Sequence, residues 1–211
     1  ETDAWKVQTF INEIGCGSAD RKAALQDGWF TLCAATYAYL LAKAAPLRVE
    51  RFGMSQVIGF TGDTLCRGCE DEWPVTSMVD WVTGDGNARY WVLRMLLDEL
   101  PRGLKRVPAT NVRCEPGAPR AAHAQAFVTV PDGRRKVLVV SKHPATLRIR
   151  VSGATGGFVS VVDGTTGDPF GCAEDPQTNK TCYVRRRRIA ADTIVVGAFG
   201  TAVVIMPQDV R

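Results

Sequence analysis

The chain has 211 residues, of which 45% are hydrophobic and 23% are charged, a balance typical of a globular protein that buries a core. Its net charge of +4 is too small to indicate a nucleic-acid-binding protein. No apolar run reaches the ~18 residues that a membrane-spanning helix requires. The first residues also lack the regions of a signal peptide, an absence that a mature chain would share.

Predicted strands and helices alternate in the first hundred residues. Residues 7–14 form a strand-like run, and hydrophobic residues then recur at helical spacing until Pro46 ends the pattern. Residues 49–60 predict a second strand, and residues 88–100 predict a second helix that Asn87 can cap. Strand, helix, strand, helix is the repeat of a parallel sheet or barrel.

The pattern changes near residue 104, after which the predicted strands are short, regularly spaced and separated by turns that contain glycine. They cover residues 124–130, 136–141, 146–151, 157–162, 183–189 and 193–206. Short strands without helices favour an antiparallel sandwich. The sequence therefore predicts a fold that is α/β over residues 1–103 and all-β over residues 104–211.

Two strand–helix units are too few to close an eight-stranded barrel. Two parallel strands alone would also leave unpaired edges and a half-buried core. We therefore expect residues 1–103 to dock against further polypeptide. This partner is either an upstream part of the same protein or a separate chain.

The seven cysteines indicate an oxidising compartment. Cys66, Cys69, Cys172 and Cys182 lie in polar, loop-like stretches, and we interpret them as disulfide candidates. A zinc site is the weaker interpretation, because the two pairs lack the spacing of zinc ligands. Cys33 lies on the apolar face of a predicted helix and is expected to be a buried free thiol.

A glycosylation sequon begins at Asn179 in the same polar loop as Cys172 and Cys182. Together with the cysteines, it favours a secretory route to an extracellular or lysosomal location. The run of four arginines at residues 185–188 has two interpretations. It could hold an acidic polysaccharide, but a solvated edge strand protected by charge is the better one.

The most informative motif is Asn12-Glu13-Ile14-Gly15, in which a carboxylate lies at the carboxyl end of the first predicted strand. In (β/α) barrels the chemistry takes place at the carboxyl ends of the strands. A retaining glycosidase uses a glutamate or aspartate as its nucleophile. The alternatives for Glu13 are an exposed carboxylate after a strand, or an acceptor that caps the following turn.

The order of the motifs resembles the last quarter of the barrel in heparanase-like glycoside hydrolases, the endo-β-glucuronidase and β-glucuronidase group. These motifs are at residues 12–15, 53–59, 80–81 and 87–91. The resemblance implies the last two βα units of a TIM (β/α)8 barrel, followed by an antiparallel β-sandwich. It implies no cofactor and no metal.

Carried over by position, the resemblance implies that Glu13 is the catalytic nucleophile at the end of the seventh barrel strand. Gln56, near the end of the eighth strand, and Asn12 would contact the sugar. Asp80 and Trp91 match positions that we interpret as structural, with Trp91 in the core. The general acid/base of the family is a glutamate on an earlier strand, so this chain alone would lack it.

These observations together predict the C-terminal part of a secreted retaining glycoside hydrolase that cleaves β-linked glycans, including those with uronic acids. Its expected partners are a glycan substrate and the remainder of the barrel, with no nucleic acid and no membrane span. The alternative is a non-catalytic extracellular glycoprotein, structural or glycan-binding, built on the same scaffold.

Overall fold

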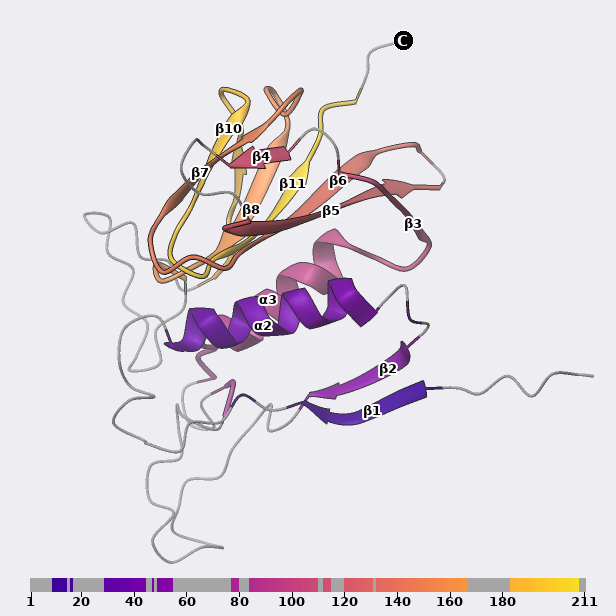
Figure 1. Cartoon of the computed structure of the whole chain (residues 1–211), viewed down its shortest axis with the longest axis vertical. Helices are drawn as coiled ribbons and strands as arrows, with labels where there is room; N and C mark the ends of the chain where they lie inside the picture. The colour runs from indigo at the N-terminus through magenta and orange to yellow at the C-terminus, as the bar shows by residue number, and fades with distance from the viewer. Residues whose placement is uncertain are drawn as a thin grey trace, which may run out of the picture.

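The structure is a computed structural model that describes residues 9–14, 16, 29–44, 47, 49–54, 77–79, 84–109, 112–114, 120–130, 132–166 and 183–208. The described residues form four layers (Figure 1). A parallel pair of strands lies on one side of two helices, and a six-stranded sheet lies on the other side. A three-stranded sheet covers the far face of the six-stranded sheet.

The first two layers are built from two strand–helix units. Strand β1 (Thr9–Ile14) pairs in parallel with β2 (Val49–Met54), and helix α2 (Trp29–Ala44) lies between them in the chain. Helix α3 (Ala88–Glu99) follows β2 and packs beside α2. Parallel neighbours need such a crossover, so the alternation predicted from the sequence is confirmed for these elements.

The start of α3 is fixed by Asn87. Its side-chain oxygen accepts a hydrogen bond from the backbone N–H of Arg89 at 3.1 Å, as predicted for a cap. Its side-chain amide donates to the carbonyl of Ser77 at 2.8 Å, and its backbone N–H donates to Met78 at 2.9 Å. The cap therefore ties residues 77–79 to the amino end of α3.

The remaining strands form two antiparallel sheets in the described part of the chain. The larger sheet has the order β3 (Leu104–Val107), β5 (Ala122–Thr129), β6 (Arg135–Ser141), β11 (Thr201–Ile205), β8 (Phe158–Val162) and β9 (Arg186–Arg188). The smaller has the order β10 (Thr193–Val196), β7 (Leu147–Val151) and β4 (Val112–Cys114). The predicted antiparallel strands are thus present, and each sheet presents one face to the other.

The central strands of the larger sheet are buried on both faces. Val137 and Val139 of β6 belong to a hydrophobic cluster between the two sheets, whereas Leu138 and Val140 belong to a second cluster with the helices. Successive strand residues point to opposite faces, so one uninterrupted apolar run serves both clusters. The second cluster includes Tyr37, Val92 and Met95 from the helices, and it therefore joins the two halves of the chain.

One predicted strand is wrong. Residues 193–206 form two strands, β10 and β11, which lie in different sheets. The turn between them needs glycine: a Cβ atom at Gly200 would lie 2.8 Å from Val196 and 2.9 Å from Asp163. The Asp163 carboxylate also accepts the backbone N–H of Gly197 at 3.1 Å. Two glycines in an otherwise apolar stretch thus mark the change of sheet.

The prediction for Cys33 is half right. Its side chain is fully buried, but it forms a disulfide with Cys16 and is not a free thiol. Helical spacing predicts burial, yet it says nothing about a partner 17 residues away at the end of another element. Cys114 is the free cysteine among the described residues. The other four cysteines and Asn179 lie outside them.

Strand β9 is an edge strand of the larger sheet, and all three of its arginines are exposed. This confirms an edge strand for three of the four arginines of the run, although Arg186 also pairs with the buried Glu99 carboxylate. In the part of the chain that the structure describes, no helix has both the length and the apolar character needed to span a membrane.

Candidate functional site

The residues singled out from the sequence lie in β1 or follow β2 in the chain. Ile14 and Met54 are partners in the parallel pair, so the two strands end at the same edge. The backbones of Asn12 and Glu13 lie in the last three positions of β1, and their side chains are outside the description. Gln56 comes two residues after the end of β2 and also lies outside the described residues.

The ends of these strands are anchored to the helices. The Cys16–Cys33 disulfide joins the segment after β1 to α2, with 5.7 Å between the two Cα atoms. Ile14 and Met54 are partly buried against the cluster that the helices share with the larger sheet. The backbone that carries Glu13 is therefore held by a covalent bond and by packing on the helical side.

A buried arginine connects the amino ends of the two helices. Arg89, in the first turn of α3, is only 1% exposed. Its guanidinium carbon lies 5.4 Å from the ring centroid of Trp29 and 5.7 Å from that of Phe30, the first residues of α2. It also donates to the carbonyl oxygen of Ser77. Aromatic faces and a carbonyl thus stabilise a cation that has left water.

The same burial shifts the pKa of two neighbouring groups, Tyr37 and Arg89. Burial raises the pKa of the Tyr37 hydroxyl, and the nearby Arg89 guanidinium opposes this increase. Burial lowers the pKa of Arg89, and the nearby Tyr37 opposes that decrease. The sequence did not predict this cluster, because Trp29 and Phe30 come from a different helix than Arg89. Its one signal was the capping residue Asn87, two positions before Arg89, which marked the start of α3.

Trp91 and the two histidines make packing or hydrogen-bond contacts within the fold. Trp91 is partly buried against the helical cluster, with its ring edge-to-face to Tyr90 at 5.1 Å, which agrees with the predicted core role. The His143 ring nitrogen accepts the backbone N–H of Ala145 at 3.2 Å, a contact within a turn. His123 packs edge-to-face on Tyr39 at 5.2 Å. Asp80 lies outside the described residues.

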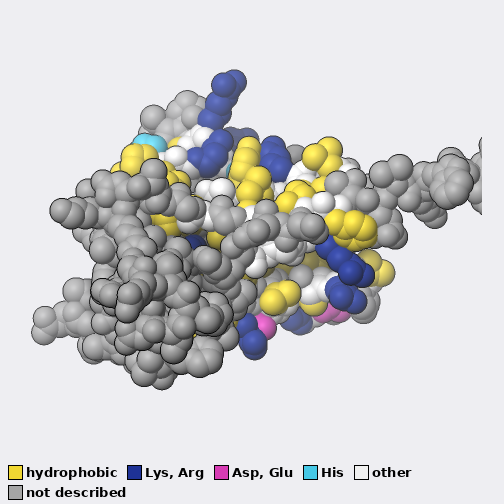
Figure 2. Space-filling model, turned by 90° about the horizontal axis from the view of Figure 1, so that it is seen from below, with side chains coloured by type: hydrophobic (Ala, Val, Ile, Leu, Met, Phe, Trp, Pro, Cys, Tyr) yellow, Lys and Arg dark blue, Asp and Glu magenta, His cyan; other side chains and the backbone are white. Residues whose placement is uncertain are grey.

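An apolar cavity and exposed hydrophobic side chains lie beside β2 and the helices. A cavity of about 460 Å³ opens between α2, β2, α3 and the larger sheet, lined mainly by hydrophobic side chains that include Leu41, Phe52 and Leu96. Leu47 and Leu97 are 72% and 74% exposed. Seen from below, the described surface shows hydrophobic side chains with Lys and Arg between them (Figure 2). Exposed apolar surface of this kind is typical of an interaction site.

The chain matches no protein family model and no curated protein. It is similar in structure to CelM2, a bifunctional glucanase-xylanase from a metagenome library, with 14% identity, a TM-score of 0.51 and coverage of 99% of this chain and 32% of that chain. An arabinose-bound GH51 α-L-arabinofuranosidase is 12% identical, with a TM-score of 0.55 and coverage of 85% and 28%. A conserved exported protein from Bacteroides fragilis is 9% identical, with a TM-score of 0.54 and coverage of 95% and 39%.

The chain shares its fold with glycoside hydrolases. At identities of 9–14% this likeness concerns the fold alone. The matched part includes the helical layer as well as the sheets, because 85–99% of this chain is covered. The chain spans 28–39% of the length of these three structures.

Proposed function

We propose that this chain is the C-terminal part of a secreted retaining glycoside hydrolase in which Glu13 is the nucleophile. Residues 1–103 would supply the last two βα units of a TIM barrel, and residues 104–211 the β-sandwich domain. The observation that carries the proposal is the position of Glu13 beside the end of β1, at the edge where the parallel strands β1 and β2 both end. That edge is where barrel enzymes place their chemistry.

In this mechanism Glu13 attacks the anomeric carbon of a β-linked sugar while a second carboxyl group protonates the departing oxygen. Water then hydrolyses the glycosyl ester, with the second group acting as base. The two carboxyl groups must be about 5–5.5 Å apart. The mechanism requires the Glu13 side chain to lie on the face of β1 away from α2, where Gln56 would have sugar hydroxyls within reach.

The second carboxyl group and the rest of the barrel would come from further polypeptide. In the described part of the chain, β1 and β2 pair only with each other, so each has an unpaired edge. Unpaired strand edges and exposed apolar side chains favour association with more protein. Phe10 of β1 is 46% exposed, and the apolar cavity beside β2 opens to the surface. Additional barrel strands and helices would cover these surfaces.

The substrate and location follow from separate observations. The resemblance to heparanase-like enzymes supports a β-linked glycan that contains uronic acids. The Cys16–Cys33 disulfide supports an oxidising compartment, and the likeness to an exported protein agrees with it. We therefore propose a secretory route that leads to an extracellular or lysosomal location.

Activity of the complete protein with a Glu13→Gln substitution tests the nucleophile. Turnover of β-glycosides should fall by several orders of magnitude, because glutamine cannot form the glycosyl ester. The matched control is Asp98→Asn, which removes an exposed carboxylate of α3 that pairs with Arg94 at 2.9 Å. The control should keep wild-type turnover. Equal turnover in the two variants would reject the role of Glu13.

The same experiment separates the enzyme from its alternative. A non-catalytic glycan-binding glycoprotein would bind the glycan without turning it over, in the wild type as well as in both variants.

A further inference from the structure

Basic side chains from distant parts of the sequence gather where α2 meets the larger sheet. Lys43 lies in the last turn of α2, and its ammonium nitrogen is 5.4 Å from the centroid of the Tyr39 ring. The ammonium nitrogen of Lys142, the residue that follows β6, is 6.0 Å from the same centroid. The fold therefore places two cations around one aromatic ring.

A histidine lies beside these two lysines. His123 of β5 packs edge-to-face on the Tyr39 ring, with 5.2 Å between the ring centroids. Its cross-strand partner is Val140, a member of the cluster shared with the helices, so His123 faces the helical side of the sheet. The backbone N–H of Lys142 donates to the carbonyl of Ala121 at 2.7 Å. This hydrogen bond continues the pairing of β5 with β6 and keeps Lys142 next to His123.

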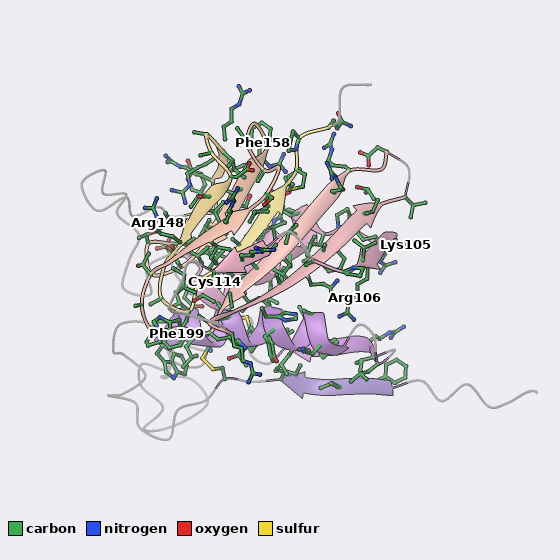
Figure 3. All side chains as sticks on the ribbon, turned by 45° about the horizontal axis from the view of Figure 1, so that its top comes forward. Lys105, Arg106, Cys114, Arg148, Phe158 and Phe199 are labelled. Carbon is green, nitrogen blue, oxygen red and sulfur yellow. A yellow bond between two sulfur atoms is a disulfide. The ribbon has the colours of Figure 1, made fainter. Side chains whose placement is uncertain are left out.

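Arg106 of β3 adds another positive charge on the same face. Its cross-strand partner is Phe127, which also packs on the helical side. Its guanidinium donates to the side-chain oxygen of Gln125, a neutral partner that leaves the charge of the arginine in place. Figure 3 shows Arg106 between the larger sheet and the helical layer. We call the four basic residues the basic cluster: Lys43, Arg106, His123 and Lys142.

The basic cluster has positive charge without a described carboxylate to offset it. Neither Lys43 nor Lys142 forms an ion pair with a described Asp or Glu. Both lysines are exposed, whereas Tyr39 and His123 are partly buried. The Nε2 atom of His123 is buried and has no hydrogen-bond partner among the described residues. Burial and the three surrounding cations lower the pKa of His123.

We propose that the basic cluster binds an oxyanion, which is a sulfate, phosphate or carboxylate group. Ammonium and guanidinium groups donate charge-assisted hydrogen bonds to such oxygens. A bound anion would offset the repulsion between the cations that the fold brings together. It would also give the Nε2 atom of His123 a partner, and a buried polar atom without a partner is unfavourable.

The basic cluster is separate from the candidate active site. Helix α2 connects the carboxyl end of β1 to the amino end of β2, so it runs in the direction opposite to both strands (Figure 1). Its last turn, which carries Lys43, therefore lies at the opposite end of these layers from Glu13. The proposal goes beyond the proposed function and does not depend on it.

The test is an NMR titration of the complete protein with sulfate, phosphate and acetate, at an ionic strength held constant with sodium chloride. The imidazole of His123 is the probe, and His123→Gln distinguishes its resonances from those of His143, the other histidine of this chain. At least one ion should shift the His123 resonances until they saturate. The same ion should raise the pH at which His123 titrates, because a nearby anion favours the imidazolium form.

The comparison of ions identifies the chemistry and source of the anion. A response to sulfate or phosphate indicates a tetrahedral group, and a response to acetate indicates a carboxylate. Glucose 6-sulfate, glucose 6-phosphate and glucuronate carry the same groups on a sugar. Tighter binding of one of them than of its free ion would assign the anion to a glycan, whereas equal binding would assign the free ion. The absence of a saturable response to all of these ligands would overturn the proposal.

Charge variants show whether the response comes from the basic cluster. Lys43→Gln combined with Lys142→Gln should lower the affinity about tenfold or more, since each exposed charge contact contributes modestly. The matched control combines Lys105→Gln with Arg188→Gln, which removes two positive charges from other exposed positions, and it should bind as the wild type does. Lys43→Arg with Lys142→Arg keeps both charges and should keep most of the affinity. Equal losses in the test and control variants would contradict the site.

Thermal unfolding separates binding from a structural role. Lys43 also lies where a cation stabilises the carboxyl end of a helix, so its replacement alone can change the melting temperature. The preferred ion should raise the melting temperature of the wild type and the control by more than that of the test variant. An equal rise in all three would be a general salt effect and would contradict the site. Glu13→Gln should keep the anion response, so failures of the nucleophile and of the basic cluster give different results.

Discussion

At the residue scale, strand geometry gives neighbouring arginines of the run at residues 185–188 different surroundings. Arg186 points to the helical side of the larger sheet, where it donates two hydrogen bonds to the Glu99 carboxylate at 3.1 Å and 2.7 Å. Ser160 donates to the same carboxylate at 2.9 Å. Glu99, at the end of α3, is only 5% exposed. Residues 87 positions apart form this ion pair, so no local sequence pattern could predict it.

The two partners of this ion pair should differ in their effect on stability. Arg186→Leu should lower the free energy of unfolding by about 1–3 kcal/mol, because it leaves a buried carboxylate short of its main donor. Glu99→Gln should cost less, because the half-exposed Arg186 side chain can turn to water. The control Arg187→Leu should stay within about 0.5 kcal/mol of the wild type. Urea unfolding measures all three, and a larger loss for Glu99→Gln would contradict this account.

Asp192 should make the stability of the sandwich depend on pH in the acid range. Hydrogen bonds from the Thr155 hydroxyl and from the backbone of Gly153 and Thr155 lower the pKa of Asp192 from 3.8 to about 2. Its folded-state pKa is therefore below its unfolded value. The carboxylate stabilises the fold fully above the unfolded pKa, and this contribution is lost as the pH falls from about 4 to about 2.

Urea unfolding of Asp192→Asn and wild type at several pH values measures this effect. The difference in stability between them should be constant near neutral pH and should shrink between pH 4 and pH 2. A difference that is the same at pH 2 and pH 7 would show that these hydrogen bonds do not depend on the charge.

At the scale of elements, the sequence predicts most helices and strands because their hydrophobic periodicity is local. Both described helices and strands β5 to β8 lie close to their predicted ranges. The errors occur where contacts between distant residues determine the positions and ends of the strands. Strands β3 and β4 have only four and three residues, and the stretch that contains β10 and β11 is mostly apolar, so its hydrophobic pattern does not mark the turn between the two strands. A short strand gives too few residues for a period to be recognised.

The Cys16–Cys33 disulfide should be the main covalent support of the first strand–helix unit. Replacing both residues, as Cys16→Ser with Cys33→Ala, should lower the free energy of unfolding by about 2–4 kcal/mol, because the unfolded chain gains the entropy of an open loop. A reducing agent should lower the melting temperature of the wild type by more than that of the double variant, which keeps the candidate disulfide cysteines Cys66, Cys69, Cys172 and Cys182. An equal decrease in both would mean that packing alone holds this unit.

At the scale of the whole molecule, the layers separate two regions of different chemistry. The edge where β1 and β2 end carries the candidate nucleophile, and the exposed Arg113, Arg148 and Arg150 belong to the outermost sheet on the opposite side. The sequence predicted the first region, since a carboxylate at a strand end is a local motif. It did not predict that Arg113 lies next to Arg150, because the two become neighbours only through the pairing of β4 with β7.

The most direct test of the proposed function is to trap the glycosyl ester in the complete protein. A 2-deoxy-2-fluoro β-glycoside with a good leaving group forms the ester quickly and releases it slowly, so peptide mass spectrometry can locate the modified residue. We predict a modified Glu13 in the wild type and no modification at that position in Glu13→Gln. A label on a different carboxylate of the protein, with Glu13 unmodified, would contradict the proposed mechanism.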